Sequence, residues 1–402
     1  MVGMKSYPRF YTELLKEHVS ENRQMAFLSG PRQVGKTSVC RELATRYLNW
    51  DDQDARDTIL KGPAAVAGFA GLDRLRAADG VLALDEIHRY ARWKTFLKGF
   101  FDVYGEEVCI VVTGSSRLDV YKRGGDSLMG RYFHYRMHPF SVAELVSVST
   151  RKTPITQPRP LADTEWGALR DFGGFPEPFT RRDARFSRRW QSLRNSQLLR
   201  EDVRELTRIG EIDQLIALST LLDARSGQQI VYASLAKEVR VSENTVRAWI
   251  GVLSVLHRGF LVRPWHRSVA AAIRKEPKWY LRDWSVIEDE GQRAETLVGC
   301  HLLKAVEGWT DMGLGRFDLF YLRDKQKREV DFLVTKDQNP WFLAEVKKSD
   351  TALSPSLDFM QRQLGAEHAF QVVMDESYLD KDCFGRRRPT VVPALTFLSQ
   401  LL

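Results

Sequence analysis

Eight consecutive residues near the start of the chain have the spacing of a phosphate-binding loop. Residues 30–37 read GPRQVGKT, which matches the pattern G-x-x-x-x-G-K-[ST]. The apolar run 25–28 predicts a buried strand before the loop, and residues 38–43 predict a helix after it. In this context Lys36 would contact the β- and γ-phosphates of a nucleotide, and the Thr37 hydroxyl would bind Mg²⁺. A glycine turn without this function would leave the agreement of strand, loop and helix unexplained. The candidate nucleotide-binding residues are Gly30, Pro31, Arg32, Gln33, Val34, Gly35, Lys36, Thr37 and Ser38.

A second apolar run ends in two carboxylates. Residues 81–84 read VLAL and are followed by Asp85 and Glu86. A strand without polar alternation is buried on both faces, as in the middle of a parallel sheet. Beside a phosphate-binding loop, Asp85 would hold Mg²⁺ through water, and Glu86 would act as general base on the attacking water. Without that loop, a strand that ends at an acidic turn would be the simpler interpretation.

Polar residues follow a third predicted strand at residues 108–114. Ser115 and Ser116 come directly after it, where a hydroxyl could reach a γ-phosphate or its water. Further along, Arg131 ends the loop segment 127–131, and no acidic residue near it in the sequence is an obvious partner.

Together these motifs resemble those of the AAA+ superfamily, and more closely the bacterial and archaeal AAA+ ATPases that carry a C-terminal DUF4143 domain. The matching segments are GPRQVGKT at 30–37, YLNWDD at 47–52, LALDEIHR at 82–89, VVTGSS at 111–116, SLMGR at 127–131 and FGGFPEP at 172–178. The resemblance implies that Ser115 or Ser116 is the sensor-1 residue. It also implies that Arg131 is an arginine finger that acts on a neighbouring subunit. One departure is that no clear sensor-2 arginine follows residues 173–176.

The composition is that of a multidomain globular protein. A chain of 402 residues is long enough for two or three domains with their own cores. The net charge of +8 favours an anionic partner. The four cysteines form no C-x-x-C pair, which argues against a zinc site. The N-terminal residues have no signal-like apolar segment, and no stretch reaches the ~18 apolar residues of a membrane span. We therefore expect a cytoplasmic protein with no membrane contact.

The order of expected elements predicts an α/β protein with four regions. Residues 1–150 alternate strands and helices, as in an AAA+ core built on a parallel sheet. Residues 151–210 are expected to form a helical lid and a basic helical linker, and residues 211–285 a winged helix. Residues 286–402 are expected to form an α/β domain of the restriction-endonuclease-like type.

The linker contains a strongly basic segment at residues 181–208. Nine arginines stand there against four acidic residues, with apolar residues at helical spacing between them. One interpretation is the solvated face of an amphipathic helix. The other is a contact with the phosphate backbone of DNA, which clustered guanidinium groups favour.

The third region has the pattern of a helix-turn-helix with a wing. The expected elements are helices at 234–239 and 242–256 and strands at 259–262 and 278–281. Asn244, Thr245 and Arg247 fall outside the apolar face of the second helix, which in DNA-binding proteins of this kind enters the major groove. The alternative is a module that only packs against other parts of the protein.

The last region contains a second set of residues that could do chemistry. Asp331 lies on a predicted strand, and Glu345 and Lys347 lie two residues apart on the next strand, so both point to one face. Two carboxylates can bind a hard cation, and a neighbouring lysine can position a water or stabilise a phosphate. Glu295, on the preceding predicted helix, could add a third carboxylate.

This D…E-x-K arrangement resembles the PD-(D/E)xK nuclease fold. The matching residues are Glu295, Asp331, Glu345 and Lys347, and Gln363 would be the polar residue on the helix that follows. The resemblance implies either a metal-dependent nuclease site or an inactive domain that keeps only binding functions. A live site should cut DNA with Mg²⁺ or Mn²⁺.

The sequence thus predicts a DNA-binding AAA+ ATPase that couples ATP hydrolysis to DNA processing, such as branched-DNA recognition, repair, replication or defence. Its cofactors would be ATP and Mg²⁺. Its partners would be duplex or branched DNA and further copies of the chain, with a hexamer among the options. The alternative is a nucleotide-switched protein-interaction ATPase whose nuclease-like domain is inactive.

Overall fold

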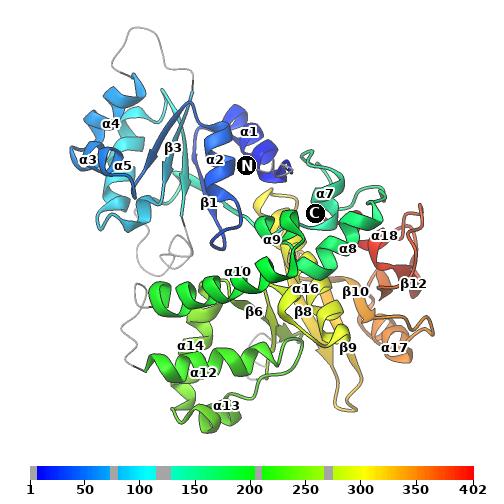
Figure 1. The fold of residues 1–402 in the computed structure, drawn as a ribbon. Helices are drawn as coiled ribbons and strands as arrows, with labels where there is room; N and C mark the ends of the chain where they lie inside the picture. Colours follow the sequence, from blue (N-terminus) through cyan, green and yellow to red (C-terminus); the bar gives the residue numbers. More distant parts are fainter. Residues whose placement is uncertain (1–6, 73–79, 115–127, 204–210, 267–274) are drawn as a thin grey trace. The chain divides into compact units, whose positions relative to one another are not determined.

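The computed structural model describes residues 7–72, 80–114, 128–203, 211–266 and 275–402, which divide into two compact units (Figure 1). The N-terminal unit contains the described residues up to Pro139 together with Ser147–Thr150. The C-terminal unit contains Phe140–Val146 and the described residues from Arg151 to Leu402. No helix in these described ranges is long and apolar enough to cross a membrane.

A sheet of five parallel strands forms the centre of the N-terminal unit, in the order β2-β3-β4-β1-β5. Its strands are β1 (Met25–Ser29), β2 (Arg46–Asn49), β3 (Val81–Asp85), β4 (Cys109–Thr113) and β5 (Tyr132–Arg136). The chain therefore places β4 between β1 and β3, and the strand order reverses beside β1. In open parallel sheets, ligands bind outside the carboxyl ends of the strands at such a reversal. The predicted phosphate-binding loop leaves β1 at this edge.

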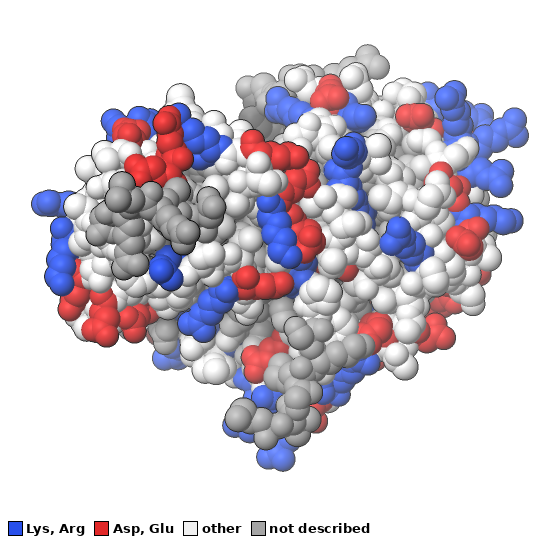
Figure 2. Space-filling view, turned by 90° about the horizontal axis from the view of Figure 1, so that it is seen from above, with Lys and Arg blue, Asp and Glu red and all other residues white. Residues whose placement is uncertain are grey.

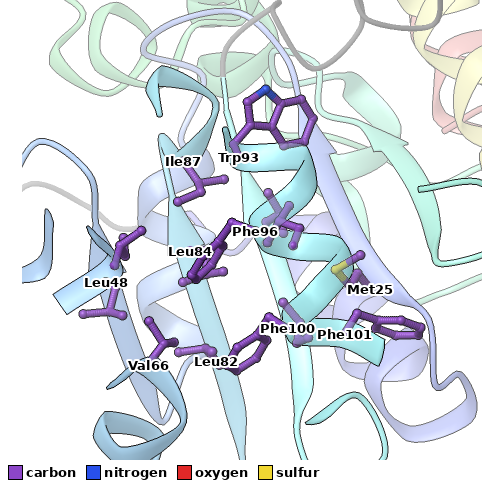
Figure 3. Close-up of a cluster of buried hydrophobic side chains, with 14 of the residues drawn as sticks. Met25, Leu48, Val66, Leu82, Leu84, Ile87, Trp93, Phe96, Phe100 and Phe101 are labelled. Carbon is purple, nitrogen blue, oxygen red and sulfur yellow. The ribbon is translucent and has the colours of Figure 1, made fainter. Parts of the chain in front are cut away.

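Helices cover both faces of this sheet (Figure 1). One face carries α1 (Phe10–Glu21) and α2 (Lys36–Leu43), and the other carries α3 (Gln53–Leu60), α4 (Pro63–Ala70) and α5 (Trp93–Tyr104). On the α5 face, Figure 3 shows Phe96 and Phe100 packed over Leu82 and Leu84 of β3. Each large apolar side chain buried there stabilises the fold by about 1.5–3 kcal/mol. This packing keeps β3, and therefore Asp85 at its end, in a defined place.

The first half of the C-terminal unit is helical. Its elements are α7 (Val142–Val146), α8 (Asp163–Phe172), α9 (Pro176–Arg181), α10 (Ala184–Gln197) with a π-helical continuation at Leu198–Asp202, α12 (Ile212–Asp223), α13 (Tyr232–Val239) and α14 (Glu243–Val255). α13 and α14 form the expected helix-turn-helix. Val246, Ile250 and Leu253 of α14 are buried, which confirms the predicted apolar face, and the Ser242 hydroxyl caps the helix by accepting from the Thr245 N–H at 3.1 Å.

The second half contains a seven-stranded mixed sheet in the order β12-β11-β10-β9-β8-β6-β7. Its elements are β6 (Gly259–Pro264), β7 (Lys278–Leu281), α16 (Glu290–Asp311), β8 (Phe317–Arg323), β9 (Glu329–Lys336), β10 (Asn339–Lys347), α17 (Pro355–Leu364), β11 (His368–Val373), β12 (Thr390–Pro393) and α18 (Ala394–Ser399). The β6–β7 hairpin is the expected wing, yet β6 also pairs in parallel with β8 through Arg263 and Phe320. The expected boundary between residues 285 and 286 therefore does not separate two sheets, because this pairing continues one sheet across it.

Some arginines of the basic segment at residues 181–208 are packed or paired inside the protein. Arg194 of α10 is buried, with its guanidinium 4.0 Å from the centre of the Phe175 ring. Arg182 pairs with Glu165 at 2.5 Å. Arg188 and Arg189 are exposed. Within the described part of the segment, α10 is therefore a partly packed amphipathic helix whose outer arginines can meet a partner.

Two polar side chains of α16 anchor the short helix α7. The Lys304 ammonium forms a fully buried ion pair with Glu144. One turn earlier, His301 donates from Nδ1 to the Leu297 carbonyl at 2.8 Å and accepts the Val142 N–H at Nε2, 3.1 Å away. Burial lowers the pKa of His301 to about 3, so the ring is neutral and one nitrogen can accept. The Ser141 hydroxyl caps α7 by accepting the Glu144 N–H at 3.2 Å.

We predict that Lys304→Met destabilises the C-terminal unit by about 3–5 kcal/mol, because it leaves the Glu144 carboxylate buried without its lysine. Urea unfolding, combined with hydrogen exchange of the α16 amides, would measure the loss. The matched control is Lys304→Met/Glu144→Leu, in which no charge is stranded and most of the stability should return. A double variant no more stable than the single one would show that the ion pair is not the cause.

Candidate active site

The phosphate-binding loop has the backbone that its glycines predict. Gly30 and Gly35 have φ angles of 151° and 105°, which side chains rarely allow. Lys36 begins α2, and its buried ammonium donates to the carbonyls of Gly30 and Pro31 at 2.9 and 2.8 Å. Burial lowers the pKa of Lys36, although Glu86 and Asp85 oppose the shift. The ammonium thus lies inside the curve of the loop, where it can exchange carbonyl oxygens for phosphate oxygens.

Asp85 is the point at which three strands and α2 meet. Its carboxylate accepts hydrogen bonds from the hydroxyls of Thr37 at 2.8 Å and Tyr47 at 2.6 Å, and from the hydroxyl of Thr113. These donors come from α2, β2 and β4, so the order of the sheet brings them together. Thr37 and Asp85, the two residues predicted to hold Mg²⁺, are therefore in direct contact. This arrangement fits a cation bound between the loop and the end of β3.

Glu86 follows Asp85 with a left-handed backbone. Its φ of 54° is uncommon for a residue with a side chain, and its N–H donates to the Thr113 carbonyl at 3.0 Å. One Glu86 carboxylate oxygen lies 3.5 Å from Nε2 of the buried His88. Burial and the charge of Asp85 raise the pKa of Glu86, while Lys36 opposes the shift. A carboxylate of raised pKa is a stronger base, as proton abstraction from water requires.

The sequence analysis did not identify Arg9 and Tyr47, two further residues of this region, as functional candidates. Arg9, just before α1, is buried and donates to the carbonyl of Val34 within the loop and, at 2.7 Å, to that of His138. Tyr47 is the first residue of the matched YLNWDD segment, but its contact with Asp85 depends on the pairing of β2 with β3. The nearest sequence signal for Arg9 is a lone arginine before an amphipathic helix, which is too common to be informative.

The remaining predicted residues of this site have different outcomes. Ser115 and Ser116 lie outside the described residues, so their sensor role stays a prediction. Arg131 has an acidic partner that proximity in the sequence does not show, because it binds both oxygens of Asp102, on α5, at 2.7 and 3.1 Å. This pair lies at the surface, where an ion pair contributes little to stability.

A second polar cluster lies in the C-terminal unit, around the predicted D…E-x-K residues. Asp331 accepts the Val346 N–H at 2.9 Å, and the Lys347 ammonium contacts Glu345 at 2.9 Å. Burial and the charge of Asp331 raise the pKa of both Glu295 and Glu345 to about 7. Glu295, Asp331 and Glu345 therefore lie close enough together for their charges to interact.

The sequence analysis did not predict the cation in this cluster. Lys278 of β7 lies with its ammonium 3.0 Å from Glu295, 2.7 Å from Glu329 and 3.6 Å from Asp331. Burial opposes its charge, but these three carboxylates together raise the pKa of Lys278. In the described part of the chain, no group of three acidic, histidine or cysteine side chains is arranged to hold a metal ion. The cluster therefore does not fit the metal that the resemblance implies.

Gln363 does not reach this cluster. It is exposed on α17. The buried glutamine of that helix is Gln361, whose amide donates to the carbonyls of Ala366 and Arg387 at 3.1 and 2.8 Å. Helical spacing explains the difference, since residues two apart on a helix lie on different faces.

The outer face of the helix-turn-helix is polar. Asn244 and Arg247 of α14 are exposed, and Arg247 pairs with Glu243 at 2.6 Å while lying over the Tyr232 ring. Arg258, which follows α14, is buried and bound to Asp223 at 2.5 Å. On the face seen in Figure 2, basic and acidic side chains are interspersed.

We predict that Arg9→Met lowers the free energy of unfolding of the N-terminal unit by about 2–4 kcal/mol, because two buried carbonyls lose their charged donor. Denaturant unfolding would measure this, and hydrogen exchange should rise at the loop amides 33–38. Arg23→Met is the matched control, since Arg23 pairs with Glu106 at the surface and should cost less than about 1 kcal/mol. Equal effects of the two substitutions would contradict a special role for Arg9.

Three family models match successive parts of the chain. The first, described as an AAA domain, matches residues 22–146. The second and third are domains of unknown function, DUF8612 at residues 170–288 and DUF4143 at residues 290–390. The AAA model covers the β1 loop, β3 and Arg131, and the DUF4143 model covers Glu295, Asp331, Glu345 and Lys347.

Individual proteins are more distant. The uncharacterized protein Rv2008c of Mycobacterium tuberculosis is 25% identical over 339 residues, which are 81% of this chain and 71% of that protein. The Orc1 protein of Aeropyrum pernix in complex with DNA aligns with 74% of this chain and 94% of its own, at 15% identity and a TM-score of 0.33. AMPPCP-bound DnaA of Aquifex aeolicus aligns with 60% of this chain and 86% of its own, at 13% identity and a TM-score of 0.31. Such low scores lend no weight to a functional comparison.

The family models, by contrast, show that this chain carries an AAA domain at its N-terminus and a DUF4143 domain at its C-terminus, the architecture expected from its motifs.

Proposed function

We propose that the N-terminal unit binds ATP with Mg²⁺ and hydrolyses it. The observation that carries this proposal is the contact between Thr37 and Asp85, with Lys36 inside the loop and Glu86 next to them. Hydrolysis of a phosphoanhydride needs cations on the phosphates, a cation ligand set and a base for water, and these side chains supply each. The AAA domain assignment supports the same reaction class.

The roles of the residues follow from their positions. Lys36 would transfer its hydrogen bonds from the loop carbonyls to phosphate oxygens, with no change in the fold. Thr37 and Asp85 would hold Mg²⁺, which when bound neutralises phosphate charge, and Tyr47 and Thr113 would keep the Asp85 carboxylate oriented. Glu86 would take a proton from water on a carboxylate oxygen, and its burial makes it a better acceptor.

Arg131 would complete the site of a neighbouring subunit in a homo-oligomer. A transferring phosphoryl group is stabilised by an added guanidinium. Arg131 lies at the surface of the unit, directly before β5. It would have to exchange Asp102 for the phosphates. A surface ion pair of this kind contributes little to stability, so Asp102 can hold the arginine until a partner subunit arrives.

We predict that Glu86→Gln retains ATP binding and lowers the hydrolysis rate by roughly 10²–10⁴-fold, because an amide cannot accept the proton. Lys36→Ala should instead weaken ATP binding, since it removes the cation inside the loop. Equilibrium binding of labelled ATP and phosphate release would separate the two effects. Glu107→Gln, a change at an exposed glutamate of the same unit, is the control. Hydrolysis at the parent rate by Glu86→Gln would remove Glu86 from the mechanism.

We further propose that the C-terminal unit binds DNA and that ATP hydrolysis serves DNA processing. The supporting observation is the helix-turn-helix of α13 and α14. The apolar side chains of α14 are buried, and its exposed face carries Asn244 and Arg247. Both side chains can reach base edges when such a helix lies in the major groove. The net charge of +8 assists the approach of a polyanion.

We predict that Asn244→Ala/Arg247→Ala weakens duplex DNA binding by at least tenfold, and that wild-type binding falls steeply between 50 and 200 mM salt as phosphate contacts are lost. Fluorescence anisotropy with duplex, forked and four-way DNA would measure both. Arg362→Ala is the matched control, because Arg362 forms the same kind of i, i+4 pair, with Asp358 on α17. If both proteins bound DNA alike, α14 would not be the DNA-binding element.

The alternative is a nucleotide-switched protein that holds a protein partner. The observation in its favour is that Arg182, Arg194 and Arg258 are engaged inside the C-terminal unit, which leaves fewer cations for phosphates. ATP hydrolysis that no DNA substrate stimulates, together with absent DNA binding at low salt, would favour this alternative.

A further inference from the structure

The acidic cluster of the C-terminal unit is built around an ammonium group. Lys278 is almost completely buried, with a side chain only 4% exposed, and its Nζ lies within 3.0 Å of carboxylate oxygens of Glu295 and Glu329. A lysine is rarely buried to this extent unless it is paired. These contacts come from α16 and β9, whereas Lys278 itself begins β7, so the cation joins three elements.

Carboxylate oxygens of Glu295 and Asp331, next to Lys278, already have donors. Glu295 Oε1 accepts both from Lys278 and, at 2.6 Å, from the Tyr280 hydroxyl. One oxygen of Asp331 faces Lys278 and the other accepts the Val346 N–H. A metal ion bound here would have to displace the ammonium and compete with these hydrogen bonds.

The charges of the cluster explain why one cation is required. Four carboxylates meet there, from Glu295, Glu329, Asp331 and Glu345. They face three cations, namely Lys278, Lys347, which contacts Glu345, and Arg323, which contacts Glu329 at 3.0 Å. Without Lys278, the carboxylates would outnumber the remaining cations by two, an imbalance that one divalent cation could compensate.

We propose that the Lys278 ammonium takes the place of the divalent cation in this D…E-x-K cluster, so that metal does not bind there. Through its ion pairs, Lys278 also holds the wing strand β7 against α16 and β9. The inference does not depend on the proposed ATPase or DNA-binding functions. It makes Lys278 the residue that excludes metal from a set of carboxylates that could rearrange around a divalent cation once the lysine is removed.

The test compares the full-length wild-type protein with Lys278→Met, Asp331→Asn and Lys278→Met/Asp331→Asn, all free of nucleotide. Mn²⁺ alone is the probe, with binding followed by the loss of its electron paramagnetic resonance signal and by thermal unfolding. Any Mn²⁺ held by the phosphate-binding loop is common to all four proteins and cancels in the comparison. We expect wild type and Asp331→Asn to bind equal amounts of Mn²⁺.

Lys278→Met should unfold at a lower temperature without metal and bind one additional Mn²⁺. Its unfolding temperature should rise by roughly 5 °C when Mn²⁺ is a hundred times the dissociation constant. The double variant should show neither gain. Lys278→Arg, which keeps a cation there, should bind no additional Mn²⁺.

Two results would overturn the proposal. One is an Mn²⁺ site in the wild type that Asp331→Asn abolishes, because metal would then displace the lysine. The other is a folded Lys278→Met protein that binds no additional Mn²⁺, because the lysine would not be what excludes metal. If Lys278→Met fails to fold, the comparison of wild type with Asp331→Asn still decides between exclusion and displacement.

Discussion

Parallel pairing between β6 and β8 joins the two halves of the C-terminal unit through one sheet. Through Arg263 and Phe320, it extends the sheet of the D…E-x-K region into the hairpin that follows the helix-turn-helix. A hairpin attached only to α13 and α14 could move with them. Once β6 is part of the larger sheet, β7 lies against α16, and Tyr280 and Lys278 reach Glu295. The helix-turn-helix and the acidic cluster are therefore parts of one compact unit.

In the N-terminal unit, the corresponding constraint is the carboxylate of Asp85. Three hydroxyls from α2, β2 and β4 converge on it, and each donor depends on the order of the parallel sheet. A bound cation would take over the Thr37 contact, while Tyr47 and Thr113 can stay in place. In the proposed ATPase site, the Asp85 carboxylate would thus be oriented before any ligand binds, which would reduce the reorganisation needed for chemistry.

The parts of the structure that depend on local patterns could be predicted from the sequence. The loop at 30–37, the end of β3 and the buried face of α14 depend on residues a few positions apart. Lys278 and Arg9 could not be predicted, because their partners lie 17 to 129 residues away and no local pattern marks a lysine or arginine destined for burial. For the same reason the β6–β8 pairing was missed, and with it the single sheet. Arg131 shows the same limit, since Asp102 is its neighbour only after α5 packs on the sheet.

The neutral imidazole of His301 makes the stability of the C-terminal unit depend on pH in acid. Its Nε2 must stay unprotonated to accept the Val142 N–H, and the folded pKa of about 3 lies below the ordinary value of about 6.5. Because the pKa is depressed by folding, His301 is protonated in the unfolded chain at pH values where it stays neutral in the folded chain. The contribution of His301 to stability is therefore complete above about pH 6.5 and declines as the pH falls toward 3. At neutral pH, His301 therefore makes the stability of the contact between α7 and α16 depend little on pH. In acid, proton uptake by His301 in the unfolded chain favours unfolding.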